Sequence, residues 1–495
     1  MPAFVALLFV AAAAMLPPAA VASASDHDSV AQAFLYSALM IATLAGFAAI
    51  AGQSFRRAKG AADFLMGLLA AYIFLPVVLA LPVAGALRDT SFINAYFEML
   101  SAFTTTGASY YLPERLVPSI HLWRGIVGWL GGLLTWVTAM AILAPLDLGG
   151  FEVSSEARLQ ADGQTAPIIG EGVRPVERVR RAVRQLAPIY AFLTGLLWLA
   201  LVITGAAPLP ASVQAMATMS TSGIALPGHA AGGRVAEAFI ALFLIFALTR
   251  RAFLPGDAAG YLGRIRRDRE VRLALFALVI VTTLVFLRHW LGALEVDRLG
   301  NPGLALRALW GNLFTALSFL TTTGFVSADW DAARTWSGLP TPGLVLIGLC
   351  LMGGGVATTA GGIKLLRVYA LYKHSARELG KLVHPHSVAA SGRLGRRIRR
   401  EGAYIAWIFF MLFVVALAAC MAALGVVGID FEAAMVLSIS ALTTTGPLAE
   451  AALADPIIYA DLALGPRIVL SCAMIVGRLE LLVLLALINP SFWRN

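Results

Sequence analysis

A short run of hydroxyl residues that ends in glycine occurs four times in this chain, and this repeat limits the possible folds more than any other feature. The copies are Thr104-Thr105-Thr106-Gly107, Ser220-Thr221-Ser222-Gly223, Thr321-Thr322-Thr323-Gly324 and Thr443-Thr444-Thr445-Gly446. Each copy follows a short apolar segment of about three helical turns and precedes a long apolar run. Such turns offer backbone carbonyls, the ligands that replace water around a monovalent cation. The repeat therefore favours four turns that line one cation pathway.

The composition places these turns in a membrane. Of the 495 residues, 59% are hydrophobic and 13% are charged, whereas soluble domains are about 45–50% apolar. The three cysteines, which lie in or beside apolar runs, suggest neither a disulfide framework nor a zinc site. One membrane crossing takes roughly 20 apolar residues. Ten such runs are predicted, near residues 4–22, 33–51, 64–87, 122–143, 187–205, 235–250, 272–290, 342–370, 403–426 and 466–488.

Basic residues mark the loops that are predicted to face the cytoplasm. They gather in four segments between predicted crossings, at 56–59, 158–184, 250–272 and 364–400. Cytoplasmic loops carry an excess of Lys and Arg, so both termini are expected in the cytoplasm. The formal net charge of +9 arises from these blocks, and this pattern argues against a nucleic-acid partner. Contact with anionic membrane lipid is an alternative explanation of the same loops.

The first 25 residues allow two interpretations. An apolar run at 4–21, followed by Ala22-Ser23-Ala24, is similar to a secretory leader with a cleavage site. However, no Lys or Arg precedes the run, and Pro17-Pro18 also fits a kinked helix exit. A retained first transmembrane helix is expected.

Four outer segments are too short or too weakly apolar to cross the membrane. Helix-start signals open three of them: Pro210 with Ser212, Asn301 with Pro302, and Asp430. We expect half-helices that dip inward and end at the glycine turns, so that the negative end of each helix dipole favours a cation near the bilayer centre. The segments are 92–103, 209–219, 304–320 and 430–442.

The near-regular spacing of the turns indicates internal duplication. The predicted fold is an all-α integral membrane protein, with four pseudo-repeated units of helix, pore half-helix, filter and helix around one central pore. Irregular backbone at membrane depth is tolerated where it lines a wet cavity. The predicted division is 1–60, two additional N-terminal transmembrane helices; 61–150, pore repeat 1; 151–263, pore repeat 2; 264–380, pore repeat 3 with a broken gating helix; and 381–495, pore repeat 4.

Together with the four turns, several further motifs make the chain similar to the Trk/Ktr/HKT superfamily of potassium transporters. The two extra N-terminal crossings make it most similar to the bacterial TrkH-type members, and the resemblance covers nearly the whole chain. These motifs are Trp129-Leu130-Gly131-Gly132, the glycine-rich run 353–364, Gly477-Arg478-Leu479-Glu480 and Met15-Leu16-Pro17-Pro18.

In this superfamily, glycine in all four filters goes with potassium selectivity and serine in the first filter with sodium conduction. The resemblance therefore implies a potassium filter. Glycine also permits the backbone angles that a filter needs, although a lone glycine is equally consistent with a helix C-cap. Pro447 is expected to stiffen the fourth quarter, because proline fixes its own φ. The predicted filter residues are Thr105, Thr106, Gly107, Thr221, Ser222, Gly223, Thr322, Thr323, Gly324, Thr444, Thr445 and Gly446, with potassium on the last two of each set.

The run 353–362 holds five glycines, which predicts a break in that crossing. Close helix packing through small residues is the alternative; the resemblance implies an intramembrane gating loop with Lys364 at its inner end. Arg478 lies inside the last apolar run, where a charge is expensive. An ion pair with Glu480, or a side chain that snorkels to the membrane surface, would explain how this charge is tolerated. The resemblance instead places Arg478 in the pore below the filter. The predicted gating residues are Gly353, Gly354, Gly355, Gly361, Gly362, Lys364 and Arg478.

The leading hypothesis is potassium uptake across the bacterial inner membrane. No nucleotide motif is found in the sequence, so no organic cofactor is expected on this chain; the resemblance implies a homodimer on cytosolic nucleotide-binding TrkA-type subunits. A sodium- or proton-coupled cation carrier is the alternative, although it predicts inverted repeats. A membrane-embedded enzyme is a third class and lacks a recognisable nucleophile cluster. Acidic outer residues, Glu98 among them, are candidates for concentrating cations at the mouth or for ordinary solvated helix ends.

Overall fold

The chain is described here from a computed structural model, in which the described part is all-helical. The structure describes residues 3–51, 61–144, 175–226, 233–249, 263, 265, 268–295, 302–330, 343–383, 393–453, 455–481 and 483. Among these residues, seven helices are long and apolar enough to cross a membrane, which confirms the prediction of a multi-span membrane protein. They cover Phe4–Ala24, Asp28–Ala51, Asp63–Ala86, Pro118–Leu143, Val176–Ile203, Arg269–Arg288 and Gly402–Val426.

Three predicted crossings are not continuous helices. The run predicted at 235–250 is α10 (Gly233–Leu244) followed by a short 3-10 turn, η6 (Ile245–Ala247). The run at 342–370 divides into α15 (Leu344–Met352) and α16 (Leu365–Val383), so the predicted break is confirmed. In the run at 466–488, α20 (Leu464–Leu479) ends where Glu480 takes a φ of 63°. Hydrophobicity alone does not reveal such interruptions.

A short helix precedes each glycine turn, as predicted. These half-helices are α5 (Phe92–Phe103), α9 (Pro208–Ser220), α13 (Pro302–Leu320) and α18 (Phe431–Leu442). Asp430 caps α18, because its carboxylate accepts a hydrogen bond from the Ala433 N–H at 3.3 Å. The start of α9 differs from the expectation at Pro210: the helix begins at Pro208, where proline suits the first helical position.

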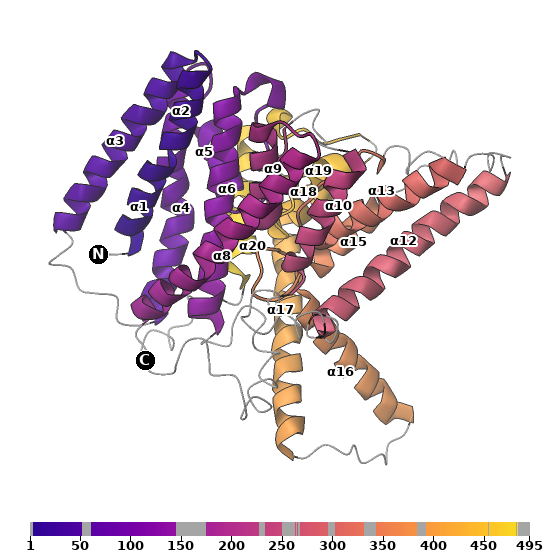
Figure 1. Cartoon of the computed structure of the whole chain (residues 1–495). Coiled ribbons are helices and arrows are strands. Elements are labelled where there is room, and N and C mark those ends of the chain that lie inside the picture. Colours follow the sequence, from indigo (N-terminus) through magenta and orange to yellow (C-terminus); the bar gives the residue numbers. More distant parts are fainter. Residues whose placement is uncertain are drawn as a thin grey trace.

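Long helices enclose these short ones. At the N-terminal end, α1 (Ala3–Ala14) and α2 (Leu16–Ala24) pack against α3 (Asp28–Ala51), which continues to α4 (Ala61–Ala86). Met15, between α1 and α2, is fully buried. The half-helix α9 packs between α6 (Pro118–Thr138) and α8 (Pro175–Ile203). Figure 1 shows α16 and the lower half of α17 projecting from the bundle, on the side where α1 begins.

The remaining elements are α12 (Arg269–Glu295) and α17 (Arg393–Val426), together with short pieces around the turns. Those pieces are η2 (Pro113–Arg115), η3 (Ala139–Leu143), α19 (Leu448–Ala451) and η8 (Tyr459–Asp461). The shortest α-helix among the described residues, α19, follows the fourth glycine turn directly.

Candidate functional site

The four glycine turns share one local structure. Two positions before each glycine, a threonine lies in the left-handed region: Thr105 (φ 55°), Thr221 (53°), Thr322 (55°) and Thr444 (54°). A β-branched residue rarely adopts this conformation. In each turn the hydroxyls on either side of that threonine contact each other, at 2.8 Å for Thr104–Thr106, 3.0 Å for Ser220–Ser222, 3.0 Å for Thr321–Thr323 and 3.2 Å for Thr443–Thr445. One strained backbone is thus repeated four times.

The four turns meet one another in a closed ring. Gly107 lies so close to the carbonyl oxygen of Ser222 that a β-carbon would overlap it. Gly223 stands in the same relation to the carbonyl oxygen of Thr323. The ring closes through the fourth turn, as Pro447 packs on Gly324 and the Gly446 N–H donates to the carbonyl oxygen of Thr106 at 2.6 Å. The first three glycines have φ values of 74°, 65° and 87°, which residues with a side chain rarely adopt.

The fourth turn departs from the four equivalent ligand sets that the sequence predicts. Gly446 lacks the positive φ of the other three glycines. The carbonyl of Thr445 accepts hydrogen bonds from the Ser440 hydroxyl (2.9 Å) and the Leu448 N–H (3.1 Å). That of Gly446 accepts from the Tyr459 hydroxyl (3.0 Å) and the Ala449 N–H (3.2 Å). This difference of the fourth turn has a local cause. A proline suits the start of a helix, and the short helix α19 begins directly after Pro447.

A loop between α15 and α16 lies against the inner side of the turns. Its Gly361 N–H donates to the Thr322 hydroxyl at 2.7 Å, and Gly361 also contacts the carbonyl oxygen of Thr443. The Thr359 hydroxyl donates to the carbonyl oxygen of Met219 at 3.3 Å. The loop therefore touches the half-helix α9 and the third and fourth glycine turns.

Backbone hydrogen bonds hold this loop on both sides. The Ile363 N–H donates to Leu351 O at 3.0 Å, and the Leu365 N–H donates to Gly354 O at 2.9 Å. In addition, the Val356 N–H of the loop donates to the carboxylate of Glu270, in the first turn of α12, at 2.8 Å. Gly354 and Gly355 pack against the carbonyls of residues 247 and 248, leaving little room for a β-carbon. The predicted break is confirmed, and the glycines also permit close backbone contact, whereas the gating role stays a prediction.

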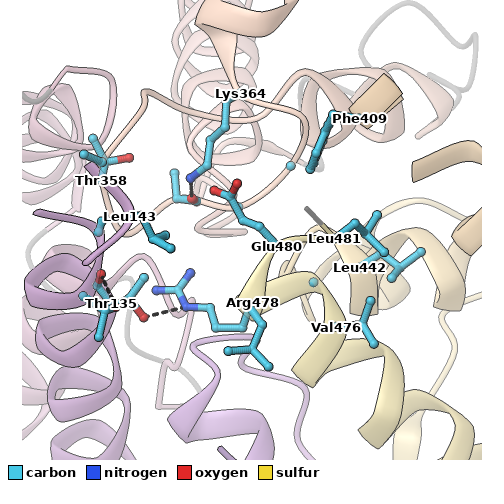
Figure 2. A pocket seen from close by; sticks show the side chains of 18 of the residues that line it. Thr135, Leu143, Thr358, Lys364, Phe409, Leu442, Val476, Arg478, Glu480 and Leu481 are labelled. Carbon is cyan, nitrogen blue, oxygen red and sulfur yellow. Dashed lines mark hydrogen bonds between the residues drawn. The ribbon is translucent and has the colours of Figure 1, made fainter. Parts of the chain in front are cut away.

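Beside the loop lies a cavity with a mainly apolar lining that also includes the charged side chains of Lys364, Arg478 and Glu480 (Figure 2). Its volume is about 40 Å³, more than the roughly 10–15 Å³ that one water needs. Arg478, 7% exposed, donates to the Thr135 hydroxyl at 2.8 Å and to the carbonyl oxygen of Thr359 at 2.6 Å. Lys364, 6% exposed, donates to Ala360 O.

The carboxylate of Glu480 pairs with Arg367 at 2.9 Å, whereas Arg478 is bonded to the loop and to α6. Arg367 is fully buried, with its guanidinium 3.7 Å from the Phe409 ring centroid. The lining of the cavity thus includes two cationic side chains, Lys364 and Arg478, and the carboxylate of Glu480, so positive charge predominates among the charged groups that line it.

Comparison with known proteins agrees with this architecture. The family model described as "TrkH: Cation transport protein" matches residues 270–493. The Trk system potassium uptake protein TrkH of Escherichia coli K12 is 30% identical over 441 residues, which cover 85% of this chain and 86% of that protein. The chain belongs to the TrkH cation transport family. As a member of a transport family, it is not an enzyme.

Further relatives extend the likeness along this TrkH-family chain. The Trk system potassium uptake protein TrkI of Halomonas elongata is 29% identical over 440 residues, which cover 86% of this chain and 82% of that protein. The crystal structure of the potassium transporter TrkH from Vibrio parahaemolyticus superposes with a TM-score of 0.80, covering 99% of this chain and 98% of that one. Its sequence identity is 24%, so it shows that the all-helical fold is shared.

Two buried carboxylates fix the outer segments of this TrkH-family fold. Glu98, within α5, is 1% exposed and pairs with Arg124 at 2.6 Å, while its second oxygen accepts the Tyr110 N–H at 2.7 Å. Glu237, within α10, accepts from the Ser327 hydroxyl at 2.8 Å and the Ala328 N–H at 2.7 Å. The chain segments after the first and third turns are thus each held by one glutamate.

Neither interpretation of Glu98, a residue that concentrates cations at the mouth or a solvated helix end, agrees with the structure, because this carboxylate is buried and paired. Its position inside an apolar half-helix was a usable signal, since a charge in such a place needs a partner. Ser440, Tyr459 and the Arg367–Glu480 pair also went unrecognised in the sequence. Nothing in their spacing distinguishes them from ordinary packing residues.

Replacing Glu98 by alanine is expected to lower the free energy of unfolding by about 3–5 kcal/mol, because Arg124 would remain as an unpaired buried charge. Thermal unfolding of the purified protein in detergent measures the change. Asp89→Ala is the matched control, since the Asp89–Arg115 pair is exposed, with side chains 69% and 42% accessible, and such pairs contribute little. Equal losses in the two variants would contradict the structural role of Glu98.

Proposed function

We propose that this chain conducts potassium ions into a bacterial cell across the inner membrane, down their electrochemical gradient. The closed ring is the observation that carries the proposal, since it brings together the glycine turns that follow all four half-helices. In support, the relatives in Escherichia coli and Halomonas elongata are named as potassium uptake proteins.

The proposed filter consists of the three residues that end each turn. Potassium sheds water there and is coordinated by carbonyl oxygens. The repeats that carry the turns would follow the boundaries expected from the sequence, with two extra helices before residue 61 and one turn in each later segment. The filter residues are those predicted above, at 105–107, 221–223, 322–324 and 444–446.

The proposed gate is the loop 353–362 together with Lys364 and Arg478. The contact of Gly361 with the third turn and the bonds of Arg478 to the loop and to α6 support this role. An ion leaving the filter would meet the loop first and the cationic cavity next. Moving the loop and turning Arg478 aside would open the path.

The proposed assembly is a homodimer with cytosolic nucleotide-binding subunits. The relatives are named as parts of a Trk system, which supports partner subunits in general. The projecting helix α16 carries Lys373 and Arg377, so it offers a basic surface on the cytoplasmic side. Such a surface would suit regulatory subunits of the TrkA type.

The test is the purified full-length chain in liposomes, with potassium and sodium flux measured under equal gradients. We expect potassium flux to exceed sodium flux. A sodium- or proton-coupled carrier would instead require the second ion for any uptake. The absence of potassium flux, with and without regulatory subunits, would overturn the proposal.

A further inference from the structure

Two buried cationic side chains, Lys364 and Arg478, line the cavity beside the loop. Glu480 supplies the one carboxylate among the described residues of the lining, and it pairs with Arg367 at 2.9 Å. In the described part of the chain, no nitrogen of Lys364 or Arg478 lies within 4.0 Å of a carboxylate oxygen. Because Arg367 and Glu480 neutralise each other, two positive charges remain at the cavity.

Both of these side chains keep unused hydrogen-bond donors. The ammonium of Lys364 has three hydrogens, and it donates one of them to Ala360 O. The Nε atom of Arg478 donates to the Thr135 hydroxyl, and its Nη1 atom donates to the carbonyl oxygen of Thr359. The Nη2 atom of Arg478 is buried and has no partner among the described residues. A buried donor that stays unsatisfied is costly.

The two side chains enter the cavity from different elements, as Figure 2 shows: Lys364 comes from the inner end of the loop and Arg478 from α20. The rest of the lining is mainly apolar and includes Leu143, Phe413 and Leu442. Unused donors from two cations therefore meet in a space that offers them little in return.

The charge and the size of this space favour a small anion. A water molecule could accept the unused hydrogens, but it would leave two buried positive charges without a counter-charge, which is unfavourable. The cavity volume of about 40 Å³ exceeds the roughly 10–15 Å³ that one water needs. A monatomic anion therefore fits, whereas an organic anion does not.

We propose that the cavity binds one monovalent inorganic anion of the size of chloride, held between the Nη2 atom of Arg478 and the Nζ atom of Lys364. Such an anion satisfies the unused donors and cancels one of the two positive charges. It also links the inner end of the loop to α20, so it stabilises the loop in its position beside the cavity. This inference concerns the charge balance of the cavity and does not rest on the proposed potassium function.

Bromide serves as the probe, because it resembles chloride in charge and size and scatters X-rays anomalously. Crystals of the full-length protein are grown with bromide in place of chloride, and an anomalous difference map is calculated. We expect a bromide peak between the Nη2 atom of Arg478 and the Nζ atom of Lys364. Density for water at this position, without an anomalous peak, would overturn the inference.

Thermal unfolding in detergent tests the same site in solution. The full-length protein is compared in equal concentrations of potassium chloride and potassium gluconate, since gluconate is too large for the cavity. A ligand that binds only the folded state stabilises that state, so we expect the melting temperature to be about 1–3 °C higher in chloride. In Lys364→Met and in Arg478→Gln this difference between chloride and gluconate should vanish.

The matched controls remove the same kinds of charge from exposed positions. Lys373→Met removes an ammonium group from the exposed side of α16. Arg115→Gln removes a guanidinium whose side chain is 42% accessible. Both controls should keep the difference between chloride and gluconate. They also account for any general effect of chloride on the protein surface, because that effect acts on all four variants alike.

Three results would contradict the site: no difference between chloride and gluconate in the unaltered protein, a difference that persists in both Lys364→Met and Arg478→Gln, or an equal loss in the controls. If neither cavity variant folds, the bromide map of the unaltered protein decides alone. Potassium flux tests the proposed function separately. A protein that conducts potassium but binds no bromide would keep that function and lose this site.

Discussion

Alanine in place of Gly223 is expected to reduce potassium flux by at least about tenfold. The glycine has a φ of 65°, and a β-carbon there would overlap the carbonyl oxygen of Thr323 and come within 2.9 Å of Pro447. Strain of this kind amounts to roughly 1–3 kcal/mol for the backbone alone, and the overlap displaces a carbonyl of the proposed filter. Potassium flux into liposomes, normalised to folded protein, measures the loss.

Gly195→Ala is the matched control for this experiment. Gly195 lies within α8, where a β-carbon would meet nothing within 4 Å, and alanine favours a helix over glycine by about 1 kcal/mol. Its flux should equal that of the unaltered chain. Normal flux and normal selectivity in the Gly223 variant would show that this turn does not line the ion path.

Removing the guanidinium of Arg478 is expected to raise potassium flux by at least about tenfold, since each 1.4 kcal/mol of barrier is a factor of about ten in rate. In Arg478→Ala the loop loses its 2.6 Å hydrogen bond at Thr359 and the cavity loses one positive charge. Both losses lower the barrier to a cation, and at an effective dielectric of about 20 a charge within several ångströms opposes an ion by a few kcal/mol. Flux into liposomes without regulatory subunits is the measurement.

Two further variants separate charge from hydrogen bonding. Arg478→Lys keeps the charge, so its flux should stay near the low starting value. Thr135→Val removes the acceptor of the 2.8 Å bond but leaves the cation, so only a small rise is expected. Unchanged or lower flux in a well-folded Arg478→Ala protein would mean that the barrier lies elsewhere.

The sequence correctly predicts those structural features that depend on a local pattern of residues. The half-helices and the glycine turns are visible because each repeats a short signal next to a long apolar run, and α13 and α18 end at the residue expected. The break after Met352 is visible as well, since a dense run of glycines marks it. In contrast, the interruptions after Leu244 and Leu479 carry no such mark and look like continuous crossings.

What the sequence did not reveal are contacts between distant segments. Tyr459 is an ordinary aromatic residue until α19 and η8 fold back and bring its hydroxyl to Gly446. Arg367 reaches Glu480 across more than a hundred positions. Hydroxyl and ion-pair partners of this kind are set by the packed bundle, and no periodicity in the chain encodes them.

The left-handed threonines have a consequence for how the molecule is made. Each of Thr105, Thr221, Thr322 and Thr444 holds a conformation that is unfavourable by roughly 1–3 kcal/mol and persists only where its surroundings impose it. A single repeat entering the membrane from the ribosome lacks those surroundings, because each turn is shaped by contacts with the next. The hydrophobic helices can insert one by one, but the filter geometry forms only when the fourth repeat arrives. A chain truncated before residue 443 would thus cross the membrane without acquiring an ion site.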